Sequence, residues 1–98
     1  MSSSSGQPEA TGRLQRALEA FQKTQSLLLA THRKLKGLPA EEVERFWAAQ
    51  GHQIERHTQA AAVEVTAAFN AFSAAGLVAS ANDRHLVSEA QRHLAEGS

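Results

Sequence analysis

Apolar side chains recur at helical spacing over two long stretches of the chain, on either side of Gly37-Leu38-Pro39. The steps between successive positions alternate between four and three residues, which is the spacing of a coiled-coil heptad repeat. In the first stretch these positions are Leu14, Leu18, Phe21, Gln25, Leu28, His32 and Leu35. In the second they are Val43, Trp47, Gln50, Ile54, His57 and Ala61. The pattern predicts two helices, over residues 12–36 and 39–75, whose stripes face each other.

The residues between these stretches predict a tight turn. Gly37 suits the left-handed position after a helix end, and Pro39 suits the first position of a helix. Six bases and one acid lie in residues 13–36, whereas five acids and two bases lie in residues 39–75. Bases at the end of one helix and acids at the start of the next suit both helix dipoles. The sequence therefore predicts a long antiparallel helical hairpin.

A tight turn also predicts which positions of the two stripes face each other. The predicted pairs are His32 with Val43, Leu28 with Trp47, Gln25 with Gln50, Phe21 with Ile54, Leu18 with His57, and Leu14 with Ala61. Gln25 and Gln50 then share one layer of the seam. A buried polar pair in a coiled coil fixes register and partner number at some cost in stability. The alternative is that both side chains lie at the wet edge of a loose helix pair, and the pattern leaves both interpretations open.

The N-terminal residues 1–12 predict a disordered tail. They contain a run of four serines, two glycines and a proline, with no periodic apolar residue. Such a segment buries too little apolar surface to offset its conformational entropy. We therefore expect a single helical domain over residues 13–96.

The C-terminal residues predict a short third helix over residues 82–95. Ser80 and Asp83 have a spacing similar to that of a capping box, and an apolar stripe follows at Leu86, Ala90 and Leu94. The fold class is therefore all-α, a coiled-coil-like hairpin with a short third helix, similar to a three-helix bundle. Because the second helix is longer than the first, we expect the first and third to lie end to end along it.

Composition narrows the range of functions. The formal net charge is zero, whereas nucleic-acid binders usually carry a basic excess, so no nucleic-acid partner is expected. The chain has no cysteine and no apolar run close to the roughly 20 residues that span a bilayer. The N-terminus lacks the pattern of a signal peptide. We expect a soluble intracellular protein, cytoplasmic by default.

The five histidines suggest an alternative, a helical bundle that binds a metal or cofactor. His85, Glu89 and His93 lie four residues apart on one face of the third predicted helix. Three ligands spread over two turns of one exposed helix do not converge on one ion, and a metal site needs ligands from several directions. The sequence also has no glycine-rich phosphate loop. We therefore expect no metal, no cofactor and no catalytic residue.

Two helices cannot enclose all the apolar residues of the hairpin, which indicates a partner. Leu27, Leu29, Phe46 and Val63 fall at the flanks of the predicted stripes. Exposed apolar surface of this kind usually belongs to an interface. Trp47 is the best candidate for an anchor, and the alternative is that it packs only inside the hairpin. We therefore expect a non-catalytic helical protein–protein interaction module, either a small subunit or adaptor of a larger assembly or a homo-oligomer.

Overall fold

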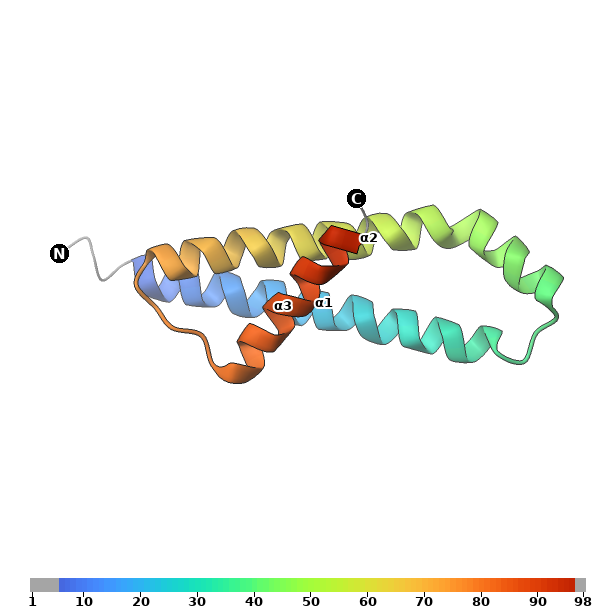
Figure 1. Cartoon of the computed structure of the whole chain (residues 1–98), viewed down its shortest axis with the longest axis horizontal. Helices are drawn as coiled ribbons and strands as arrows, with labels where there is room; N and C mark the ends of the chain where they lie inside the picture. The colour runs from blue at the N-terminus through green and yellow to red at the C-terminus, as the bar shows by residue number, and fades with distance from the viewer. Residues whose placement is uncertain (1–5, 97–98) are drawn as a thin grey trace.

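Three helices make up the fold in a computed structural model that describes residues 6–96. They are α1 (Gly6–Leu35), α2 (Ala40–Ala74) and α3 (Ala81–Glu96). The first two form an antiparallel hairpin, and α3 crosses one face of it (Figure 1). The molecule measures 61 × 22 × 18 Å, so it is a narrow rod. The predicted all-α hairpin with a short third helix is confirmed.

The two ends of α2 follow from local hydrogen bonding. Pro39 precedes the helix, and its carbonyl oxygen accepts the N–H groups of Glu42 and Val43. Gly76 ends the helix with a positive φ of 80°. The Leu77 N–H donates to the Phe72 carbonyl at 3.3 Å, which completes a Schellman motif. Gly37 does not adopt the left-handed conformation, so this part of the turn prediction is wrong.

The start of α3 also agrees with the sequence. The Ser80 hydroxyl oxygen accepts the Asp83 N–H at 3.1 Å and so caps the helix. The Asp83 carboxylate in turn accepts a hydrogen bond from the Gln15 amide at 3.2 Å. This bond attaches the beginning of α3 to α1. The observed bounds of α2 and α3 lie within one residue of the predicted ones.

The start of α1 differs from the prediction. Residues 6–12 are helical rather than part of a disordered tail, whereas residues 1–5 of the predicted tail lie outside the described residues. Thr11 lies inside the helix, where its hydroxyl donates to the Gln7 carbonyl one turn earlier at 2.9 Å. The Gln7 amide donates to the Ala75 carbonyl at 3.4 Å, so this segment lies beside the end of α2. The apolar pattern of the sequence does not indicate this contact with α2.

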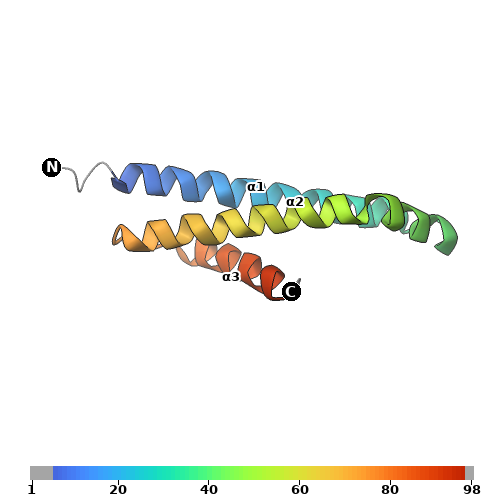
Figure 2. The ribbon, with the colours of Figure 1, turned by 90° about the horizontal axis from the view of Figure 1, so that it is seen from above.

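This longer α1 changes the position of α3. Since α1 extends to the C-terminal end of α2, no free overshoot remains for α3 to cover. The third helix therefore lies beside the hairpin and packs mainly on α2, rather than end to end with α1 (Figures 1 and 2). The expectation of an end-to-end arrangement is wrong.

The hydrophobic core lies in the half of the hairpin that α3 covers. Phe21 and Leu14 of α1 and Val65 of α2 are the largest fully buried side chains. Much of the remaining core consists of alanines, whose small side chains allow the three helices to approach closely. The buried apolar cluster consists of Leu14, Ala17, Leu18, Phe21, Ala62, Val65, Ala68, Phe72, Ala79, Val87 and Ala90.

The register of the hairpin differs from the predicted one. Thr58 and Ala62 are buried, whereas His57 is exposed and Ala61 is half-buried. Thr58 is buried at little cost, because its hydroxyl donates to the Ile54 carbonyl at 2.9 Å. A buried imidazole at position 57 would need a partner of its own. The favoured stripe of α2 is therefore shifted by one residue from His57 and Ala61.

Two further observations bear on the predicted pairs. His32 lies against Trp47, with which the predicted register does not pair it. Gln25 is half-buried and Gln50 is exposed, so they do not form a buried polar layer. The predicted role of these glutamines in fixing the register required both side chains to be buried together, and they are not.

Candidate functional site

The half of the hairpin next to the turn is only two helices thick. We call this part the arm, and it comprises residues 24–35 of α1, the turn at 36–39 and residues 40–57 of α2. Figure 2 shows that α3 stops before it. Leu35 is the only buried side chain in the arm. The arm therefore exposes most of the apolar side chains that its two helices carry.

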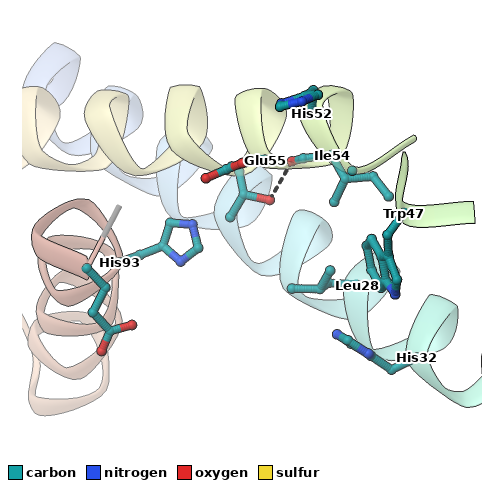
Figure 3. Close-up of a pocket in the computed structure, with 10 residues that line it drawn as sticks. Leu28, His32, Trp47, His52, Ile54, Glu55 and His93 are labelled. Atoms are coloured by element: carbon teal, nitrogen blue, oxygen red, sulfur yellow. Dashed lines mark hydrogen bonds between the residues drawn. The ribbon is translucent and has the colours of Figure 1, made fainter. Parts of the chain in front are cut away.

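A groove opens along the arm on the face where α3 ends. Its volume is about 530 Å³, which lies within the range of ligand and peptide sites. Residues of all three helices line it: Leu28, His32, Trp47, Gly51, His52, Ile54, Glu55, Thr58, His93 and Glu96. Figure 3 shows His93 at one end of the hollow, with Leu28, His32 and Trp47 grouped at the other. The groove is thus a continuation of the surface on which α3 packs.

Trp47 forms one wall of this groove and is held on two sides. Its ring centroid lies 5.3 Å from that of His32, with the planes inclined by 43°. The Phe46 ring is also 5.3 Å away and almost perpendicular, at 82°. Such tilted and edge-on contacts are favourable between aromatic rings. Trp47 and Phe46 are both half-buried, so Trp47 is fixed in place while part of it still faces the groove.

Gly51 follows Trp47 by one turn and keeps the groove wide. A Cβ atom added at this glycine would lie 3.8 Å from the Trp47 ring, an ordinary van der Waals distance. No steric conflict or unusual backbone angle requires glycine at this helical position. The missing side chain leaves space between the two helices of the arm.

A smaller hollow of about 240 Å³ lies on the other side of the seam. It shares Leu28, Ile54 and Thr58 with the first groove, because these residues lie in the seam itself. Its remaining lining residues are Thr24, Leu27, Thr31 and His57. The arm is therefore open on both faces.

The residues predicted to bind a partner fall into two groups. Leu27, Leu29 and Val63 are exposed by 61, 59 and 52%, in agreement with their predicted place at the flanks. Phe46 and Trp47 are half-buried and contact each other. All except Val63 belong to the arm, since Val63 lies on the part of α2 that α3 covers. The structure thus collects four of the five on one half of the hairpin.

Several exposed or groove-lining apolar residues were not predicted as site residues. Leu38 in the turn and Val78 before α3 are exposed by 43 and 86%. Leu28 and Ile54 form the floor of the groove, although the predicted seam buries them. Both are half-buried because the arm has only two helices, and the sequence pattern does not predict that α3 lies beside the other half of the hairpin.

The candidate metal ligands do not converge. The Nε2 atom of His85 lies 3.2 Å from Oε1 of Glu89, one turn away on the same helix. His93 lines the groove instead. Within residues 6–96, no group of three or more histidine, aspartate or glutamate side chains is arranged to hold a metal ion. The geometry therefore gives the metal alternative no site in the described part of the chain.

One bidentate ion pair joins α1 and α2 outside the arm. The Arg13 guanidinium donates from Nε and Nη2 to the two carboxylate oxygens of Glu64, at 2.9 and 3.0 Å. This hydrogen bonding lowers the pKa of Glu64 below its ordinary value and raises that of Arg13. Both side chains are about half exposed, so the pair aligns the helices more than it stabilises them.

Wider comparisons complete the description of the chain. Among residues 6–96, no helix combines the length and apolar character needed to cross a membrane. A search against protein-family models, curated proteins and solved structures finds no match to this chain.

Proposed function

We propose that this chain is a non-catalytic helical interaction module, a small subunit or adaptor that acts by packing its arm against another protein. One observation carries the proposal. The arm buries a single side chain, Leu35, while it exposes Leu27 and Leu29 by about three-fifths of their surface. Apolar side chains left open on a short two-helix segment are typical of an interface.

The energetics favour a partner for this surface. Burying a leucine fully contributes about 1.5–3 kcal/mol, so the exposed part of Leu27 on one face of the arm and that of Leu29 on the other each leave roughly 1–2 kcal/mol for association. Trp47 adds a large aromatic surface that is already held in place by His32 and Phe46. Prior ordering lowers the entropic cost of binding, and aromatic residues often dominate such contacts. The arm thus has both apolar area and an ordered anchor.

The described polar groups agree with a binding role. Within residues 6–96, every buried side-chain nitrogen or oxygen has a hydrogen-bond partner. Catalytic sites often hold perturbed titratable groups in a cleft, whereas the resolved pKa shifts here belong to Arg13 and Glu64, outside the groove. The groove has Leu28, Trp47 and Ile54 as its apolar side chains, and histidines, glutamates and Thr58 make up most of the rest of its lining.

The proposal is tested by changing the exposed leucines while the fold is kept intact. The wild-type chain, tagged at its C-terminus, is used to recover partners from extracts of its source cells, and its solution mass is measured alone. We expect either one partner in stoichiometric amount or a defined oligomer. The variant Leu27→Ser/Leu29→Ser should lose this complex while its circular dichroism stays unchanged, because both residues are exposed.

A matched control uses Val78, which is more exposed than either leucine but lies outside the arm. The variant Val78→Ser should keep the complex. A folded monomer with no stoichiometric partner, or a complex that survives the double leucine change, would contradict the proposed function.

A further inference from the structure

The charges along the groove lie on its two edges with opposite sign. Leu29 and Arg33 of α1 and Lys36, the first residue of the turn, follow one another at steps of four and three residues, so they lie in one line beside the groove residue His32. Residues 22–36 contain four lysines and arginines and no acid. The edge of the groove that α1 forms is therefore basic.

The edge formed by α2 is acidic. Glu44, Gly51 and Glu55 are separated by seven and four residues, which places them on one stripe of the helix. Gly51 and Glu55 line the groove, so Glu44 lies on the same side about two turns further along. Within residues 6–96, Arg13 forms an ion pair with Glu64 and His85 contacts Glu89, and neither contact involves the charges of either edge. The edge charges are therefore available to a partner.

The end of α3 indicates the shape of the occupant. His93 and Glu96, in the last turn of α3, form one end of the groove. The part of the hairpin that α3 covers has three helices, and the arm has two (Figure 2). A single helix in the groove would continue the line of α3 and extend the three-helix packing along the arm. The distance from Glu55 to Glu44 along α2 is about 16 Å, so three turns of helix suffice.

We propose that the groove binds one amphipathic helix of a partner protein, with acids on the edge that faces α1 and bases on the edge that faces α2. This inference rests on the proposed function and names the chemistry of its partner. The apolar stripe of the helix packs on Leu28 and Ile54 and against Trp47. Its acids meet Arg33 and Lys36, and its bases meet Glu44 and Glu55. Grooves that bind an amphipathic helix use this combination of apolar floor and charged rim.

A second copy of the chain fits the groove poorly. Two copies joined through this face with their turns at opposite ends would set α1 against α1, which brings the basic edges together. With the turns at the same end, both α3 helices would occupy the space between the hairpins, because α3 lies on this face (Figure 1). Only the second arrangement would set an acidic edge against α1 and a basic edge against α2, and in it the two α3 helices would collide.

The probe for the test is a synthetic helical peptide of about four turns. It carries a leucine stripe, glutamates along one edge and lysines along the other. Trp47 is the only tryptophan of the chain, so its emission reports on the groove. We expect saturable binding to the full chain with a blue shift of this emission. We also expect Glu44→Lys/Glu55→Lys to weaken the binding of this mixed-charge peptide at least tenfold. A second peptide, with glutamates on both edges, should bind the variant at least tenfold better than the mixed peptide does.

The matched control is Glu9→Lys/Glu19→Lys, which makes the same change in net charge at exposed positions of α1 outside the arm. It should bind the mixed peptide as the wild type does. The proposal is overturned if charge reversal at Glu44 and Glu55 has no more effect than this control, or if Trp47 emission does not respond to the peptide. It is also overturned if the chain alone doubles its mass with a shift of Trp47 emission, because a second copy then fills the groove.

These outcomes separate the inference from the proposed function. A stoichiometric natural complex that needs Leu27 and Leu29 but leaves Trp47 emission unchanged keeps the proposed function and removes the inference. If the wild-type chain forms no stoichiometric natural complex and does not bind the peptide, both the proposed function and the inference are removed.

Discussion

The imidazole of His32 lies against the indole of Trp47, with ring centroids 5.3 Å apart and planes inclined by 43°. This contact joins the two helices of the arm at the groove, where Leu35 is the only buried side chain. Phe46 approaches the same indole from α2. Trp47 therefore connects three roles in the arm: it links α1 to α2, it orders Phe46, and it offers part of its surface to the groove.

Replacing Trp47 with alanine should destabilise the fold by about 1–3 kcal/mol, less than the loss for a fully buried tryptophan. The reason is that Trp47 is only half-buried but contacts both His32 and Phe46. Urea unfolding followed by circular dichroism measures the change. Trp47→Phe should recover most of the stability, and an alanine variant as stable as the wild type would show that the ring contacts contribute nothing.

Two glycine substitutions should have opposite signs. Gly51→Ala should raise the free energy of unfolding by up to about 1 kcal/mol, because Gly51 is helical and a Cβ there meets only ordinary contacts. Gly76→Ala should lower it by about 1–2 kcal/mol, since a φ of 80° is unfavourable for alanine. Thermal unfolding of both variants measures the pair. Destabilisation by Gly51→Ala would mean that the arm requires the space that this glycine leaves.

Two large apolar residues of α1 should differ sharply in their effect on stability. Phe21 is fully buried in the three-helix core, so Phe21→Ala should cost about 3–5 kcal/mol. Leu27 is 61% exposed on the arm, so Leu27→Ala should change stability by less than about 0.5 kcal/mol. Chemical denaturation of the isolated chain measures both. A large loss for Leu27→Ala would indicate that the arm is covered in solution, for example by self-association.

The ion pair of Arg13 and Glu64 predicts a specific dependence on pH. Hydrogen bonding to Arg13 lowers the pKa of Glu64 below the ordinary value of 4.5, so the pair stabilises the fold above that pH. Its contribution should disappear as the pH falls through the lowered pKa. Carbon NMR titration of the Glu64 carboxyl group should show a midpoint below 4.5 that returns toward 4.5 in Arg13→Gln. An unchanged midpoint in this variant would rule out Arg13 as the cause.

The apolar pattern predicts the hairpin well, because the heptad spacing has a direct physical counterpart in the buried stripe of α1. Leu14, Leu18 and Phe21 are buried as predicted. The end of α2 at Gly76 and the cap of α3 at Ser80 also follow from the sequence, since both depend on local backbone chemistry. These features involve neighbouring residues and need no knowledge of distant contacts.

Features that depend on distant contacts could not be read in the same way. The segment 6–12 has no apolar stripe, and its helix lies beside the end of α2, where Gln7 donates to the Ala75 carbonyl. The register depends on whether His57 or Thr58 is buried, and the choice follows from how each satisfies its polar group. The groove requires both this register and the position of α3. For that reason the sequence predicts Trp47 as a candidate site residue but does not predict the groove floor formed by Leu28 and Ile54.

The Schellman turn at Gly76 sets where the chain reverses and therefore how far α3 extends along α2. Because α3 ends at Glu96, beside the groove, the three-helix core lies at one end of the rod, and that end is the more stable one. Amide hydrogens of the arm should thus exchange through local opening well before those around Phe21, which open only with the whole molecule. A ligand bound to the arm would stabilise the part of the molecule that opens most easily. Its binding should therefore first slow amide exchange near the turn, far from the core around Phe21.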